Sequence, residues 1–117
     1  MMKQKSMIIG IGEILWDLLP TGKKAGGAPV NFAFHAAAMG AESYAISAIG
    51  YDPQGDQMMR ELDNNGIRYL IERVAYPTGT VQVELNNGIP SYTITEGVAW
   101  DHIPLTVEMK MLAARCD

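Results

Sequence analysis

The sequence has one cysteine, two histidines and few basic residues. Cys116 alone cannot form an internal disulfide, which favours a reducing compartment, the cytoplasm. Nine Lys and Arg against 13 Asp and Glu give a net charge of −4. This balance argues against nucleic acid or a membrane surface as a partner, because both require clustered basic residues. His35 and His102 lie far apart without further ligand residues, so we expect no metal site.

Long apolar runs are also missing. The run that begins at Met7 is interrupted by Gly10, Gly12 and Glu13, well short of the ~20 residues that span a membrane. The interruption excludes a signal peptide and a membrane helix at this end of the chain. Apolar residues still make up 48% of the sequence, enough for the core of one modest domain.

Strand and helix patterns alternate over the first half of the chain. The expected elements are a strand over Met7–Gly12, its continuation over Glu13–Leu19 as a strand leaving the sheet, a helix over about Pro29–Met39, a strand over Ser43–Ile49 and a helix over about Gly55–Asn65. Pro20-Thr21-Gly22 ends the second segment, and the Lys23-Lys24 pair after it is interpreted as a solvated turn. This order predicts an α/β fold with a parallel sheet flanked by helices.

The second half begins with a hairpin pattern. Thr80–Leu85 and Pro90–Thr95 alternate between apolar and polar residues and are joined through Asn86-Asn87-Gly88, a strong turn signal. Val81 and Val83 share one face, which needs a cover. A last helix is expected over about Thr106–Ala114.

The start of the first helix has the composition of a polyol-binding corner. Gly26 and Gly27 let a ligand approach the backbone closely. Asn31 follows in the first turn, where helix N–H groups are free. Upstream, Asp17 offers two oxygens to neighbouring hydroxyls. Each residue also has a simpler interpretation: a solvated aspartate, a tight turn and a capping asparagine.

These motifs make the chain similar to the ribokinase-like (PfkB) carbohydrate kinases, and most closely to their fructokinase branch. The spacing of the first family signature is kept by Gly27, Ala28, Asn31, Ala33, Gly40 and Gly50. Four further matches occur in the right order: Gly12–Asp17, Gly50–Asp56, Thr78-Gly79-Thr80 and Ala99-Trp100-Asp101. The resemblance implies a Rossmann-like sheet with a small β-sheet lid, formed by residues 13–25 and 78–96.

The resemblance also implies a reaction, phosphoryl transfer from ATP to a primary hydroxyl of a small sugar such as fructose. ATP and Mg²⁺ would be required, with a monovalent cation as a further candidate, and the parent enzyme is expected to be a homodimer paired through the lid. The implied substrate-binding residues are Asp17, Gly26, Gly27, Asn31, Val81 and Val83.

The second family signature, an Asp-Thr-x-Gly-Ala-Gly-Asp-like run that carries the catalytic base, does not occur in this sequence. Residues 1–117 are therefore expected to be the N-terminal part of a kinase without its catalytic and ATP-binding part. Alone, this chain should be inactive, and no catalytic residue is assigned to it.

Other functions remain open at this point. One is a non-catalytic sugar-binding or regulatory relative, and another is a kinase for ribose, a nucleoside or a 2-keto sugar acid. A dinucleotide-dependent oxidoreductase is suggested by Gly10-x-Gly12, but the third glycine of that fingerprint would fall at Leu15 and no helix follows.

Overall fold

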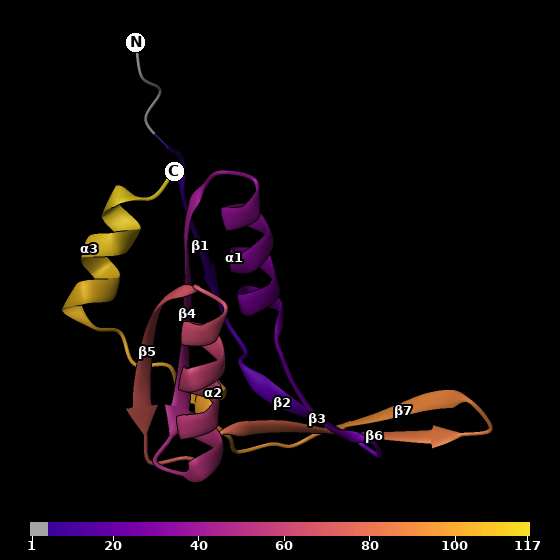
Figure 1. Cartoon of the computed structure of the whole chain (residues 1–117). Helices are drawn as coiled ribbons and strands as arrows, with labels where there is room; N and C mark the ends of the chain where they lie inside the picture. The colour runs from indigo at the N-terminus through magenta and orange to yellow at the C-terminus, as the bar shows by residue number, and fades with distance from the viewer. Residues whose placement is uncertain (1–4) are drawn as a thin grey trace.

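A computed structural model describes residues 5–117, which form two sheets in an elongated molecule of 56 × 32 × 21 Å (Figure 1). The body sheet is parallel, with the order β1 (Met7–Ile11), β4 (Glu42–Gly50) and β5 (Arg68–Val74). The other sheet extends away from the body, and we call it the projecting sheet. Its order is β3 (Gly22–Gly26), β2 (Leu15–Leu19), β6 (Gly79–Asn86) and β7 (Ile89–Ile94).

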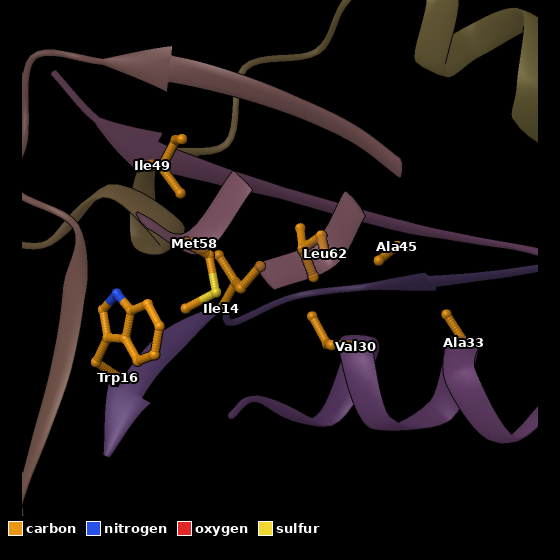
Figure 2. Close-up of a cluster of buried hydrophobic side chains, with 8 residues drawn as sticks. All are labelled: Ile14, Trp16, Val30, Ala33, Ala45, Ile49, Met58 and Leu62. Carbon is orange, nitrogen blue, oxygen red and sulfur yellow. The ribbon is translucent and has the colours of Figure 1, made fainter. Parts of the chain in front are cut away.

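Helices cover both faces of the body sheet. The core between the sheet and helices α1 (Ala28–Ala38) and α2 (Pro53–Asn64) is shown in Figure 2. Alternate β4 residues face opposite sides, so Ala45 and Ile49 join this cluster, whereas Ile46 packs with α3 (Val107–Arg115) on the other face. The short helix η1 (Ala99–His102) connects the projecting sheet to α3. These layers confirm the expected α/β class.

Local chemistry explains where the helices begin. α2 starts at Asp52, whose carboxylate accepts a hydrogen bond from the Gly55 N–H at 2.8 Å. The Thr106 hydroxyl similarly caps α3, accepting from the Met109 N–H at 3.2 Å. α1 follows Gly27, which has no side chain to cap with and adopts a φ of 114°. The first turn of α1 therefore keeps free N–H groups.

The expected hairpin is confirmed. β6 and β7 pair antiparallel, and Asn87 and Gly88 between them have φ values of 54° and 80°, which fit the type I′ turn that this sequence favours. β6 also pairs with β2 in parallel. The hairpin is thereby one half of the projecting sheet.

Two strands were missed by the sequence patterns. Lys23 and Lys24 lie in β3, so the interpretation of this pair as a turn is wrong. The Lys23 ammonium lies 4.7 Å from the centre of the Trp16 ring, a cation–π distance that holds the stem of Lys23 against the sheet. β5 was not expected, because Arg68, Glu72 and Arg73 obscure its apolar pattern.

Candidate sugar-binding face

Asp17 lies in the middle of one face of the projecting sheet. Its pairing partners are Lys24 on β3 and Val81 on β6, and paired residues project on the same side of a sheet. Leu15 and Leu19 are two positions away on the same strand and share that side. We call this side the Asp17 face.

Gly26 and Gly27 lack side chains where other residues of the same chain come close to their backbone. A Cβ on Gly26 would lie 2.7 Å from the Asp17 carboxylate oxygen Oδ2, so this carboxylate lies directly over the Gly26 backbone. A Cβ on Gly27 would collide with the Glu13 carbonyl oxygen, and its φ of 114° disfavours any other residue. The glycines therefore bring Asp17 to the N-terminus of α1, where free N–H groups begin.

Asn31 lies one turn into α1, where its N–H donates to the Gly27 carbonyl at 3.3 Å. Its exposed side chain borders a hollow of about 180 Å³ together with Phe34 and Glu61. Among the hydrogen bonds within residues 5–117, none joins Asn31 to Asp17. The structure thus brings Asp17, Gly26 and Gly27 together, whereas Asn31 borders a hollow that Ala25 and residues of α2 also line.

Val81 and Val83 are 7% and 4% exposed, and they form a cluster with Leu15 and Leu19. The two valines are thus already buried within one chain. The apolar surface continues along the same face onto β7, because Ile94 pairs with Val81 and Tyr92 pairs with Val83. These two β7 side chains are more than half exposed. The uncovered apolar part of the Asp17 face therefore lies on β7 and at Leu85, near the end of β6.

A polar network, buried at Thr78 and exposed at Asp56, joins the projecting sheet to the body. The Asp52 carboxylate accepts from the Thr78 hydroxyl at 2.6 Å and from the Thr78 N–H at 2.9 Å. The same hydroxyl accepts from the Gly50 N–H at 3.0 Å. Arg73 donates to the Gly50 carbonyl and forms an ion pair with Asp56 at 2.7 Å. The matched motifs at 50–56 and 78–80 are therefore one structural unit.

The pKa of Asp52 reflects this network. Burial by itself would raise it, but hydrogen bonds from the Thr78 hydroxyl, the Thr78 N–H and the Gly55 N–H, together with the charge of Arg73, lower it below the ordinary value. Asp52 is therefore charged in the folded chain. Its carboxylate caps α2 and binds Thr78 at the start of β6, and we call this link between the projecting sheet and the body the clamp.

Trp100 is a residue at this face whose position the sequence did not reveal. Its indole would contact a Cβ on Gly79 at 2.5 Å, so the ring lies on the Gly79 backbone. Gly79 pairs with Leu15, which places the indole at the base of the Asp17 face. The indole Nε1 is buried and has no hydrogen-bond partner within the described part of the chain. The sequence did contain the Ala99-Trp100-Asp101 motif, but spacing along the chain could not show that this motif lies near Asp17.

Within residues 5–117, no group of three His, Cys, Asp or Glu residues could hold a metal ion. None of the helices in the described part of the chain is long and apolar enough to cross a membrane.

Comparison with known proteins identifies the family. Residues 20–105 match the model of the pfkB family carbohydrate kinases. An uncharacterized sugar kinase of Pyrococcus horikoshii is 32% identical over 112 residues, which are 85% of this chain and 36% of that protein. An ATP-dependent 6-phosphofructokinase of Thermoanaerobacterium thermosaccharolyticum is 26% identical over 93% of this chain and 37% of its own length.

Solved structures agree. The crystal structure of the Pyrococcus horikoshii sugar kinase superimposes with a TM-score of 0.71, at 32% identity, over 81% of this chain and 36% of that one. The fructokinase of Vibrio cholerae gives a TM-score of 0.71, at 27% identity, over 84% of this chain and 36% of that one. The chain thus spans about a third of the length of these relatives. With the family model matched over most of its length, the chain belongs to the pfkB family of carbohydrate kinases.

Proposed function

We propose that this chain is the sugar-binding part of an ATP-dependent sugar kinase that phosphorylates a primary hydroxyl of a small sugar, with fructose as the first candidate. The observation that carries the proposal is the position of Asp17, a carboxylate on an apolar face directly over the glycine turn that opens α1. The relatives support the reaction class: the Pyrococcus horikoshii sugar kinase has been solved in complex with ATP, and the Vibrio cholerae relative is a fructokinase.

In this proposal, the chain positions the acceptor sugar. Asp17 accepts hydrogen bonds from two neighbouring hydroxyls, and the free N–H groups at the start of α1 donate to sugar oxygens. Asn31, one turn into α1, would both donate to and accept from a sugar hydroxyl. Leu15, Val81 and the apolar face around them keep water away from the transferred group. Such positioning can supply much of the rate of phosphoryl transfer.

The remaining chemistry is assigned to the part of the fold outside this chain. That part would supply the catalytic base and the ATP site, and Mg²⁺ is expected to enter with the nucleotide. The described residues offer no group of three His, Cys, Asp or Glu residues that could hold a metal ion, so none of them is assigned to Mg²⁺. We place the complete enzyme in the cytoplasm, where ATP is available.

We also propose that the complete enzyme is a homodimer paired through the projecting sheet. Tyr92 and Ile94 are 65% and 58% exposed and extend the apolar Asp17 face onto an edge strand. An exposed apolar face next to a free edge favours association with a second copy.

The function is tested by removing one carboxylate from each side of the projecting sheet in the complete kinase. Asp17→Asn removes the negative charge and replaces one of the two accepting oxygens with an NH₂ group that can only donate. We expect it to lower kcat/KM for the sugar at least about tenfold, because a hydrogen bond to a charged group contributes about 1.5–3 kcal/mol. Glu84→Gln is the matched control, because Glu84 is exposed on the opposite face of β6. The KM for ATP should change little in both variants. Equal sugar kinetics for the two variants would remove Asp17 from the site.

A phosphorylated sugar is the second candidate acceptor. Lys24 is the direct partner of Asp17 across β2 and β3, and it places a positive charge on the Asp17 face. One relative is an ATP-dependent 6-phosphofructokinase. If the acceptor carries a phosphate, Lys24→Gln should raise its KM about tenfold and leave the KM for fructose unchanged. An enzyme that phosphorylates fructose but does not phosphorylate a sugar phosphate would exclude this candidate.

A further inference from the structure

The tetrapeptide Asn-Asn-Gly-Ile occurs twice in the sequence, at residues 64–67 and at residues 86–89. Asparagine followed by glycine is a thermolabile pair, because glycine has no side chain to keep its backbone nitrogen away from the asparagine amide. Asn65 and Asn87 have the same neighbours and are both exposed, so their intrinsic reactivity should be nearly the same. A difference between them in the folded protein therefore comes from the fold.

At the first copy, hydrogen bonds restrain both groups that would react. Asn65 ends α2, and its side-chain Nδ2 donates to the Glu61 carbonyl at 2.8 Å. The Gly66 N–H donates to the Asp63 carbonyl at 3.1 Å. The next N–H along the chain donates to the carbonyl of Leu62 at 3.1 Å, and the Leu62 side chain is fully buried. This turn can react only if the end of α2 opens beside the core.

At the second copy, these restraints are missing. Asn87 and Gly88 form the turn between β6 and β7, with φ values of 54° and 80°. Within residues 5–117, no hydrogen bond involves the Gly88 N–H or the Asn87 side chain. Every residue of β7 is exposed, and so is the end of β6 from Glu84 onward. Opening this end of the hairpin uncovers no core and should cost little.

We propose that Asn87-Gly88 is a site of spontaneous covalent modification, and that the fold protects the identical sequence at Asn65. The Gly88 backbone nitrogen loses its proton and forms a bond to Cγ of Asn87. The bond from Cγ to Nδ2 breaks, and ammonia departs with that proton, which leaves a cyclic succinimide. Water then opens the ring. Cleavage of the new bond gives aspartate, cleavage of the original peptide bond gives isoaspartate, and nothing is oxidised or reduced.

Either product changes the turn. Both add one negative charge to a chain whose net charge is −4. Isoaspartate also routes the backbone through the side-chain carbons, which lengthens the turn. The turn sets the pairing of Asn86 with Ile89, and with it the pairing of Val83 with Tyr92 further along the hairpin. Isoaspartate at residue 87 should therefore loosen the attachment of β7 to β6.

The two copies can be compared in one sample. The complete kinase is incubated at mildly alkaline pH, and mass spectrometry of its peptides measures the conversion of Asn87 and of Asn65 over time. In the folded protein, conversion at Asn87 should be at least about tenfold faster, because reaction at Asn65 first requires the hydrogen bonds at the end of α2 to open. In guanidinium chloride the two rates should become equal. Equal rates in the folded protein, faster conversion at Asn65 or no conversion at Asn87 would overturn the proposal.

Asn87→Gly is the matched variant. A Gly-Gly pair also favours the type I′ turn, so the hairpin should keep its register while the reacting side chain is removed. After the same incubation, ion-exchange chromatography should separate an acidic fraction from the parent protein and almost none from this variant. Asn65→Gly, which keeps a residue suited to a helix end, should leave the acidic fraction unchanged.

An acidic fraction of equal size from Asn87→Gly and from the parent protein would place the new charge elsewhere in the chain, and this too would overturn the proposal. The reaction needs neither sugar nor ATP. Its outcome is therefore independent of the proposed function.

Discussion

Thr78→Val tests the clamp between the projecting sheet and the body. Valine has nearly the shape of threonine, so the change removes a hydroxyl from a side chain that is 2% exposed and leaves its volume in place. Two hydrogen bonds are lost, the donation to Asp52 at 2.6 Å and the acceptance from the Gly50 N–H at 3.0 Å. The Thr78 N–H still donates to Asp52 through the backbone.

The loss of folding free energy can be derived from the polar groups that stay buried in the Thr78→Val variant. The Gly50 N–H is left without a partner, which costs about 1–3 kcal/mol, and Asp52 loses one of its charge-assisted bonds, worth about 1.5–3 kcal/mol. Because the two losses share one hydroxyl and Asp52 keeps two N–H donors, we expect a total of about 2–3 kcal/mol. With an m-value of about 1–3 kcal/mol per molar urea, the unfolding midpoint should fall by about 1 M.

Thr80→Val is the matched control. It is the same substitution two residues further along, where the hydroxyl contacts the Thr95 hydroxyl at 3.0 Å in an exposed position, and it should change stability by about 0.5 kcal/mol or less. Equilibrium urea unfolding followed by circular dichroism compares the two variants. Equal midpoints for both would refute the clamp.

The clamp also predicts a pH dependence. The pKa of Asp52 in the folded chain lies below its ordinary value of 3.8, so the folded state binds fewer protons than the unfolded state. The stabilisation is fully present above that value and is lost as the pH falls through the lowered pKa. Thr78→Val should therefore make stability less dependent on pH in this acidic range than it is in the parent sequence.

Further predictions concern the glycine turn, one tyrosine and activity. Gly27→Ala should destabilise the chain by more than about 3 kcal/mol, because the new Cβ meets the Glu13 carbonyl, whereas Gly22→Ala, which also has a positive φ but open space, should cost about 1–2 kcal/mol. Thermal unfolding compares the two. The pKa of Tyr69 is raised above 10.0, first by its hydrogen bond to Asp63, so Asp63→Asn should lower it in an ultraviolet titration. A coupled assay on the 117-residue chain should show no ATP-dependent sugar phosphorylation, and turnover that scales with its concentration would contradict the assignment of the catalytic base to another segment.

The sequence predicted the elements whose patterns are local. An apolar period, a proline or a turn glycine was enough to predict each of these elements: β1, β4, α1, α2 and the β6–β7 hairpin. β3 could not be found in this way, because Gly-Lys-Lys-Ala-Gly has no apolar alternation, and it becomes a strand by pairing with β2. β5 was missed for a related reason, since its charged residues protect an edge that only the assembled sheet defines.

In the candidate site, too, local patterns predicted some features, whereas others depend on contacts between distant segments. Spacing could identify Asp17 and the glycines, because a family signature is a pattern along the chain. Spacing could not show that the Asp17 carboxylate occupies the space where a side chain at residue 26 would lie. It also could not show that Trp100 covers Gly79. Those facts depend on segments that are distant in sequence and meet at the base of the projecting sheet. They could be found only once the pairing of β2 with β6 was known.

The pairing of β2 with β6 has a consequence for synthesis of the protein. Asp17 meets its partner Val81 only after about 60 further residues have left the ribosome, which takes roughly several seconds at ordinary elongation rates. During this time β2 and β3 form at most an isolated hairpin, which is marginal in water, with Leu15 and Leu19 uncovered. The nascent chain therefore passes through a stage in which these leucines are open to chaperones or to misassembly. Substitutions that slow the closure of the projecting sheet should reduce the yield of soluble protein even where the final fold is unaffected.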